Sequence, residues 1–139
     1  MNINCKTVPN EEIKLRRGFT GADWWWEEHL TTESKMVGEY DLVLQVRIAA
    51  ELTDWRERAA LALHEISEAF MCKFLGITVE QVDAFDAEYQ RTHEIDLNSG
   101  DEPDCPYAIP HTFATAIERI FAGCVKLPWK PYDDRLSKI

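Results

Sequence analysis

The sequence lacks the cysteine pairs and the long apolar run that mark several common classes of protein. Its four cysteines are scattered along the 139 residues, and no two of them form a C-x-x-C pair. This spacing is unlike that of a disulfide framework or a zinc knuckle. There is no stretch of about 18 apolar residues, and no apolar segment near the first residues that would be typical of a signal sequence. We therefore expect a soluble cytoplasmic protein, in a reducing compartment, with no membrane partner.

Basic residues are also scarce. Lysine and arginine total 15 against 25 aspartates and glutamates, which gives a formal net charge of −10. Much of this charge lies in residues 80–104, which contain nine acids and one base, Arg91. Because nucleic-acid binding requires clustered lysine and arginine, we expect no nucleic-acid partner. Such an acidic segment instead favours an encounter with a basic protein or peptide.

The hydrophobic pattern predicts an α+β fold in a single domain over residues 1–139. The clearest strand, residues 41–49, alternates in side-chain character and can pair as a hairpin with the tryptophan-rich segment. Residues 1–8 are a weaker candidate strand. We expect a small antiparallel sheet of two to four strands, covered on one face by three helices. Those helices are predicted over residues 54–74, 79–90 and 110–123 from their capping residues and prolines. The C-terminal segment, about residues 125–139, is expected to be an extended strap because of its prolines.

The most informative stretch lies in the middle of the first long helix. His64 and Glu68 are four residues apart, so on a helix their Cβ atoms are about 6 Å apart on one face. Imidazole and carboxylate are both zinc ligands, and Glu65 occupies the place of the general base in helical His-Glu metal motifs. We therefore predict a metal site, with Zn²⁺ or another divalent transition metal as cofactor. The alternative is a solvated surface pair, which the apolar neighbours Leu61 and Leu75 disfavour.

A catalytic zinc site needs a third protein ligand and an open position for water. The helix expected over residues 110–123 carries two candidates on one stripe, His111 at its start and Glu118 two turns later. We predict His111 as the third ligand. Glu118 and Asp86 are expected either to replace a ligand or to orient one. The alternative for His111 is an ordinary helix-start residue. Another stripe of this helix is expected to face the core: Phe113, Ile117, Ile120 and Phe121.

The three consecutive tryptophans, Trp24, Trp25 and Trp26, cannot all face one core from a strand or from a helix. One interpretation is that two of them cover the sheet. The other is that they form a surface for a substrate or a protein partner, since tryptophan is enriched on such surfaces. The sequence motifs otherwise offer neither a glycine-rich phosphate loop nor a local signature around a serine or cysteine nucleophile.

The chain resembles a family of small uncharacterised proteins encoded by phages and prophages, over residues 23–118. The matching pieces are Asp23-Trp24-Trp25-Trp26, Asp54-Trp55-Arg56, Leu63-His64-Glu65 with Glu68-Ala69, Gly76-Ile77, Val82-Asp83-Ala84-Phe85-Asp86, Glu102-Pro103, and His111 with Phe113-Ala114 and Glu118. The family has no assigned biochemical function to transfer. The resemblance implies that the His-Glu helix and His111 belong to one recurring unit, and that the compartment is the host cytoplasm.

A broader resemblance is to zincin-type metallopeptidases, in which an edge strand precedes a helix with the His-Glu-x-x-His signature. The strand at residues 41–49 and the following helix have this order. The resemblance implies a zincin-like core with His64 as ligand and Glu65 as base, and an edge strand that holds an extended peptide by strand addition. Glu68 stands where the signature has its second histidine. A carboxylate there can still bind the metal, but it weakens the Lewis acidity of the site.

Three functions remain open on this evidence. The first is a metal-dependent hydrolase, metallopeptidase-like, that acts on a peptide or protein. The second is a non-enzymatic acidic accessory protein that binds and blocks a basic host protein through residues 80–104 and the tryptophans, with the His/Glu cluster structural. The third is a structural metal site with no open position. These functions differ in whether Glu65 is needed and in whether the metal keeps a free position.

Overall fold

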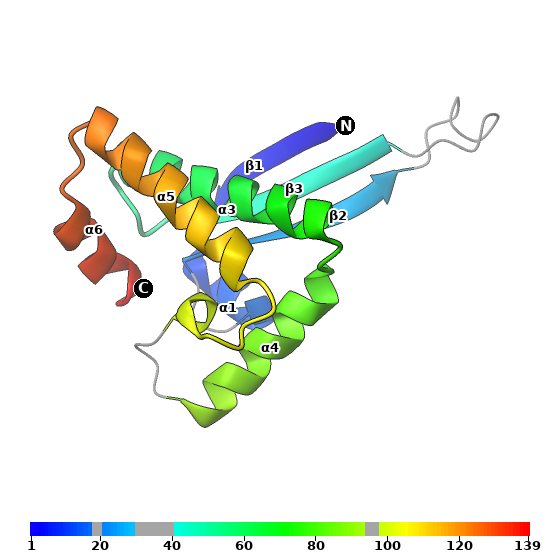
Figure 1. The fold of residues 1–139 in the computed structure, drawn as a ribbon. Coiled ribbons are helices and arrows are strands. Elements are labelled where there is room, and N and C mark those ends of the chain that lie inside the picture. Colours follow the sequence, from blue (N-terminus) through cyan, green and yellow to red (C-terminus); the bar gives the residue numbers. More distant parts are fainter. Residues whose placement is uncertain (18–20, 30–40, 94–97) are drawn as a thin grey trace.

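A computed structural model describes residues 1–17, 21–29, 41–93 and 98–139, and shows an α+β fold (Figure 1). The strands are β1 (Asn2–Val8), β2 (Ala22–His29) and β3 (Asp41–Ala49). The helices are α1 (Asn10–Arg17), α3 (Trp55–Leu75), α4 (Val79–Thr92), α5 (Ala108–Cys124) and α6 (Trp129–Leu136), with a short 3-10 helix, η1 (Ser99–Asp101). None of these described helices is both long and apolar enough to cross a bilayer.

The three strands form one mixed sheet in the order β1-β3-β2. β2 pairs antiparallel with β3, with Trp24 opposite Val46. This pairing confirms the predicted hairpin, although its connection lies outside the described residues. β1 pairs with β3 in parallel, with Cys5 opposite Val46. The expectation of a purely antiparallel sheet is therefore wrong, because α1 lies between β1 and β2 and carries the chain from one edge of the sheet to the other.

The central place of β3 also corrects the expectation that residues 41–49 form an edge strand. Both hydrogen-bonding sides of β3 are used, one by β1 and one by β2. A peptide cannot add to a strand whose backbone donors and acceptors are already paired on both sides. The free edges of this sheet belong to β1 and β2.

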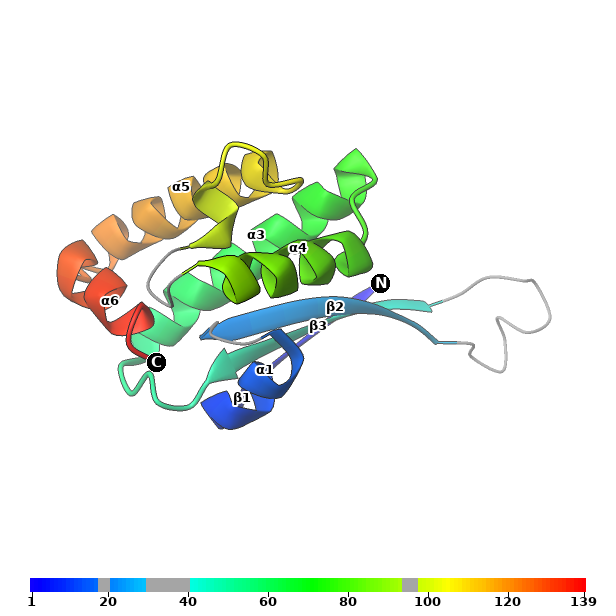
Figure 2. The ribbon, with the colours of Figure 1, turned by 90° about the horizontal axis from the view of Figure 1, so that it is seen from below.

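Helices lie on both faces of the sheet (Figure 2). α3 packs on the face formed by Leu44, Val46 and Ile48, and α4 and α5 lie on the same side of the sheet. α1 lies on the opposite side, where Arg16 Cζ is 4.7 Å from the centre of the Trp25 ring. Three helices therefore cover one face as predicted, and α1 adds a smaller layer on the other. Because side chains alternate along a strand, Trp24 points towards α3 while Trp25 points towards α1.

Local signals define the ends of α3, the helix that carries His64. The Asp54 side chain accepts a hydrogen bond from the Arg56 N–H at 2.9 Å and so caps the first turn. At the other end, Gly76 adopts φ 74° and its N–H reaches the carbonyls of Cys72 and Lys73. Both ends agree with the sequence prediction. α4 begins in the same way, with the predicted capping box between Thr78 and Gln81.

The face that α5 buries agrees only in part with the predicted one, since the expected core residues Ile117 and Phe121 are partly buried. Its buried residues include the polar His111 and Glu118, which lie against α3. The expected core residues Phe113 and Ile120 are 45% and 65% exposed. The prediction failed for these two residues because it ranked the faces of the helix by apolarity alone. Here the polar stripe is buried because its hydrogen-bonding groups find partners on α3 and α6.

The C-terminal segment is a helix rather than an extended strap. Pro128 is the residue that precedes α6, and Pro131 falls in its first turn. The first four N–H groups of a helix have no partner within the helix, so a proline there costs no hydrogen bond. Tyr132 is completely buried between α6 and the rest of the domain. α6 is therefore a docked element of the fold.

Replacing Gly76 with alanine should destabilise the protein by about 1 kcal/mol, because a side chain at positive φ is strained. Gly123, near the end of α5, is the matched control, since nothing lies within 4 Å of an added Cβ and its φ is not in the left-handed region. Gly123→Ala should leave stability unchanged or raise it slightly. Urea unfolding of the two variants and the wild type measures both effects. Equal losses of stability would contradict the assignment of Gly76 as the left-handed cap.

Candidate metal centre

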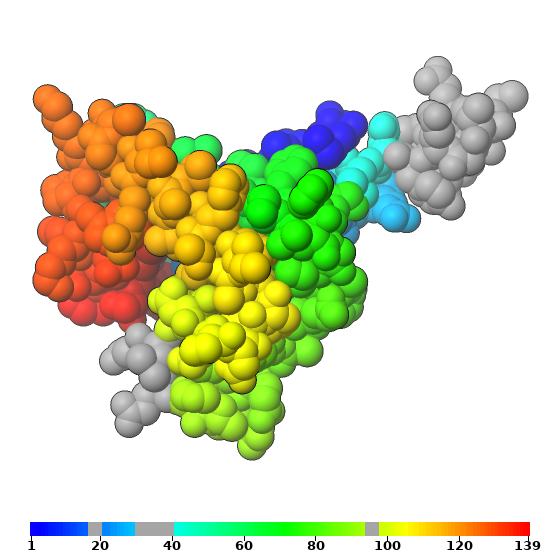
Figure 3. All heavy atoms as spheres, viewed as in Figure 1, coloured from blue at the N-terminus to red at the C-terminus, as the bar shows by residue number. Residues whose placement is uncertain are grey.

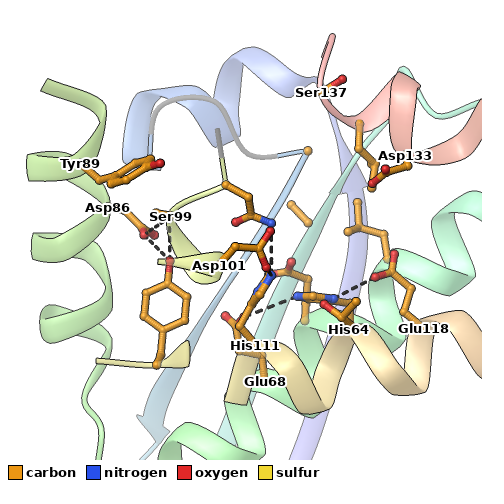
Figure 4. Close-up of a pocket in the computed structure, with 18 of the residues that line it drawn as sticks. His64, Glu68, Asp86, Tyr89, Ser99, Asp101, His111, Glu118, Asp133 and Ser137 are labelled. Atoms are coloured by element: carbon orange, nitrogen blue, oxygen red, sulfur yellow. Dashed lines mark hydrogen bonds and ion pairs between the residues drawn. The ribbon is translucent and has the colours of Figure 1, made fainter. Parts of the chain in front are cut away.

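Three buried side chains from α3 and α5 converge on one point. His64 and Glu68 leave α3 on adjacent turns, and His111 enters from the start of α5 (Figure 4). One ligand atom from each lies within 4.8 Å of the others. Their exposed fractions are only 6%, 5% and 7%. These three residues, named the metal centre below, are those predicted as ligands from the sequence.

The spacing of the donor atoms suits a single ion. Glu68 Oε2 lies 3.5 Å from His64 Nε2 and 3.1 Å from His111 Nδ1. Two ligand atoms bound tetrahedrally to zinc at about 2.0 Å are about 3.3 Å from each other. The two measured separations lie on either side of this value. Because all three donor atoms lie within 4.8 Å of one another, they are near enough to bind one small divalent ion after the side chains adjust.

In two of the three predicted ligands, His64 and Glu68, the polar atom that does not face the other ligands forms a hydrogen bond with a buried side chain. His64 Nδ1 donates to Glu118 Oε2 at 2.9 Å, and this contact leaves Nε2 as the nitrogen that faces Glu68. The Tyr132 hydroxyl donates to Glu118 Oε1. On the sheet side, Trp24 Nε1 donates to Glu68 Oε1 at 3.0 Å. This arrangement, in which carboxylates and N–H groups orient the ligands, is typical of metal sites in proteins.

His111 is held by residues 98–101, which include η1. Asn98 Nδ2 lies 3.1 Å from His111 Nε2, and Asp101 Oδ1 lies 3.6 Å from the same nitrogen. The backbone of Gly100 passes directly over the imidazole. A Cβ at Gly100 would lie 2.5 Å from His111 Cγ, closer than real side chains approach. Glycine is therefore needed at this position to leave space for the ring.

Electrostatics within the metal centre favour an imidazolium when no metal is bound. Burial by itself lowers the pKa of His64, but hydrogen bonds to Glu118 and Glu68 outweigh burial and raise the pKa to about 10. Burial by itself would raise the pKa of Glu68, but its hydrogen bonds to His111 and His64 hold that pKa well below its usual range. At neutral pH His64 therefore carries a proton that a metal ion would have to displace.

The metal centre lies at the floor of a cleft of about 630 Å³ that opens between α6 and the η1 segment. Figure 3 shows the surface notched between α6, in red, and the yellow-green part of the chain that includes η1. In Figure 4, Asp101 lies on one side of the histidines and Asp133 on the other. Glu65, the predicted base, is largely buried and lines the same cleft. The cleft gives a ligand access to the ion position.

The other predicted residues take different places. Glu118 binds His64 rather than replacing a ligand, which is one of the two roles expected for it. Asp86 lies in the cleft wall but accepts hydrogen bonds from Ser99, at 2.7 Å, and from the Tyr107 hydroxyl, which makes it a support for the η1 segment. Trp24 is completely buried, so it cannot belong to an exposed tryptophan surface.

The sequence analysis did not identify the residues that surround the predicted ligands and fix their positions. Trp24 and Tyr132 both contribute a donor to the cluster, and Gly100 provides the space over His111. The alternation of β2 shows that Trp24 and Trp25 face opposite sides, which is the only sequence signal for the first of these contacts. No sequence pattern we considered pointed to Tyr132, since its neighbouring prolines favoured an extended segment.

Gly100→Ala should weaken zinc binding by about 10-fold or more, which is the typical cost of disturbing a residue that orients a ligand. The added methyl group must displace the His111 ring from its position beside Glu68. Competition titration with a zinc indicator measures the affinity. Gly123→Ala provides the control and should bind zinc as the wild type does. Wild-type affinity in Gly100→Ala would show that His111 is not held in this way.

Zinc binding at pH 7 should release about one proton, because His64 must lose its proton to coordinate the ion. The pKa of His64 is raised, so its protonated form persists up to about pH 10 and zinc affinity should rise with pH below that value. Calorimetric titration in two buffers with different ionisation enthalpies counts the protons. Glu118→Gln removes one cause of the raised pKa and should reduce the count. No proton release in the wild type would contradict a protonated His64.

Comparisons of the chain with family models, with curated proteins and with solved structures found no match. The case for a metal therefore depends on the arrangement of the donor atoms and of the groups that hold them.

Proposed function

We propose that this chain is a metal-dependent hydrolase of zincin-like type, with one divalent ion, zinc as the expected one, bound at the metal centre. The observation that carries this proposal is the convergence of three buried donor atoms at the floor of an open cleft. A surface ion pair would not bury two histidines with a glutamate, nor would it surround them with further donors and acceptors. A purely structural site would not need a cleft over the ion position.

Glu65 is the residue proposed to move a proton. It follows His64 on α3, is largely buried and lines the cleft. A zinc ion in the metal centre would supply Lewis acidity and make water a better nucleophile. The carboxylate of Glu65 would take a proton in that reaction and return it to the leaving group. His64 and His111 hold their positions through Glu118 and through the η1 segment, so the chain itself orients the reactants.

The resemblance to zincin-type peptidases supports the proposal only in part. A strand precedes the His-Glu helix, as that class requires, but β3 is central and cannot bind a peptide by strand addition. β2 is the edge strand beside the metal centre, and the carbonyl of Trp24 already accepts a hydrogen bond from Arg16 at 3.1 Å. The cleft is therefore the better place for a peptide substrate.

The charge of the cleft suggests which peptides it would accept. Its lining includes seven carboxylates: Glu65, Glu68, Asp86, Asp101, Glu118, Asp133 and Asp134. Arg119, the one lysine or arginine among the described residues of the lining, lies over the Trp129 ring at 4.7 Å. Such a field repels phosphate groups and favours cations. We therefore propose a peptide or protein substrate with lysine or arginine near the cleaved bond, and no nucleic-acid substrate.

The second candidate function is an acidic accessory protein of a phage that binds and blocks a basic host protein. The observation that favours it is the exposure of several acids of residues 80–104, among them Glu80, Glu88, Asp101 and Asp104. In this case the metal centre would be structural. The resemblance to phage and prophage proteins fits either candidate.

Elemental analysis of purified protein should find about one equivalent of zinc or another transition metal in the wild type. His64→Ala and His111→Ala should each lose the metal. His29→Ala is the matched control, since His29 is exposed and pairs with Glu27 away from the metal centre. Absence of metal from well-folded wild type, even after reconstitution, would disprove the enzymatic proposal.

The zinc-loaded protein then separates hydrolase from binding protein. Glu65→Gln should retain the metal and lose at least 100-fold in hydrolysis of a peptide library, as removal of a general base typically costs about 10²–10⁴-fold. Cleavage should concentrate at peptides rich in lysine and arginine. Loss of hydrolysis without loss of metal supports the proposed role of Glu65. A zinc-loaded wild type that cleaves no peptide in the library would favour the accessory-protein function.

A further inference from the structure

The C-terminal helix α6 is anchored to the domain by an ion pair and by apolar packing. Arg135 forms an ion pair with Glu57, a buried carboxylate of α3. Tyr132 is completely buried in one apolar cluster with Ala60 of α3 and Ala122 of α5. Docking of α6 therefore depends on specific contacts with the two helices that carry the metal centre.

Tyr132 also reaches the metal centre through a chain of two hydrogen bonds. Its hydroxyl donates to Glu118 Oε1, and the other oxygen of this carboxylate accepts from His64 Nδ1 at 2.9 Å. Glu118 is buried while α6 is docked. The same carboxylate thus connects the position of α6 to the orientation of the His64 ring.

α6 is also one wall of the cleft. Trp129, Asp133 and Leu136 line it, and Figure 4 shows Asp133 on the side of the cleft where Glu118 lies. If α6 undocked, the cleft would lose this wall and Glu118 would lose the donor that fixes one of its oxygens. Both changes act on the metal centre, although no residue of α6 belongs to the donor set.

We propose that Tyr132 is a positioning residue that couples the docking of α6 to metal loading, an inference that rests on the metal binding proposed above. Coupling between two binding equilibria is reciprocal. Metal loading should therefore tighten the docking of α6, and docked α6 should raise metal affinity by the same factor. The C-terminal helix then acts as a wall that is held most firmly when the site is loaded.

Tyr132→Phe removes only the hydroxyl and keeps the ring packed in its apolar cluster. Zinc affinity should fall by about 10-fold, the usual cost of losing a group that orients a ligand. The visible spectrum of the cobalt-substituted protein should also change, because it reports the geometry of the ligands around the ion. A merely structural role for Tyr132 would alter neither once the variant is folded.

Tyr89→Phe is the matched control. Tyr89 is also buried, and its hydroxyl donates to a carboxylate, Glu102, at 3.0 Å, but it makes no hydrogen bond to the metal centre or to Glu118. This variant should keep the zinc affinity and the cobalt spectrum of the wild type. Equal zinc affinity and an unchanged spectrum in Tyr132→Phe, or an equal loss in both variants, would overturn the inference.

Hydrogen exchange tests the reciprocal half of the coupling. Zinc should slow exchange of the α6 amides in the wild type, and should slow it less in Tyr132→Phe. Arg135→Gln removes the ion pair with Glu57, which weakens docking of α6 without touching the metal centre, and it should also lower zinc affinity. This variant tests the coupling if Tyr132→Phe fails to fold. The coupling would be overturned if Arg135→Gln bound zinc with wild-type affinity, or if zinc left the exchange rates of the α6 amides unchanged. A wild type that binds no zinc at all would instead overturn the proposed function.

Discussion

The burial of the Glu68 carboxylate is the constraint on which the rest of the structure depends. A buried charge without partners costs several kcal/mol, so this carboxylate must be surrounded by donors. Trp24 supplies one to Oε1, while His111 and His64 face Oε2. These donors come from β2, α5 and α3. The sheet and the two main helices are thus fixed against each other at one polar point inside the domain.

This polar point explains why α5 buries its less apolar face. His111 and Glu118 are paired only when they face α3 and α6, and turning the helix to bury Phe113 and Ile120 would leave them unpaired or in water. Removing one partner of a buried charged pair typically costs about 3–5 kcal/mol. Full burial of one apolar side chain returns less, about 1.5–3 kcal/mol. The apolar stripe of α5 is therefore exposed because the polar stripe must be buried to reach its hydrogen-bond partners.

The same cluster links stability to the proposed function. Two histidines, two glutamates and a tyrosine share one network, in which every pair except His64 and Glu68 joins segments distant in sequence. Such a network holds ligands in a fixed geometry before a metal arrives, which lowers the cost of binding. Its cost is the desolvation of buried charged groups, which an apolar core would not require. A protein without a ligand for this site would gain little from keeping the arrangement.

The sequence by itself determined the local parts of the molecule: the strand at residues 41–49, both ends of α3, the capping box of α4, and the placement of His64, Glu65 and Glu68 on one helix. These features depend on residues within about four positions of each other. It also named His111 as the third member of the cluster. Only the tertiary structure decided that β3 is central, that α5 turns its polar stripe inward, that α6 is a helix, and that Trp24, Gly100 and Tyr132 hold the site. Those outcomes depend on which distant segments of the chain come into contact. These contacts are decided by the balance between burying charged groups and burying apolar ones, and this balance involves the whole chain.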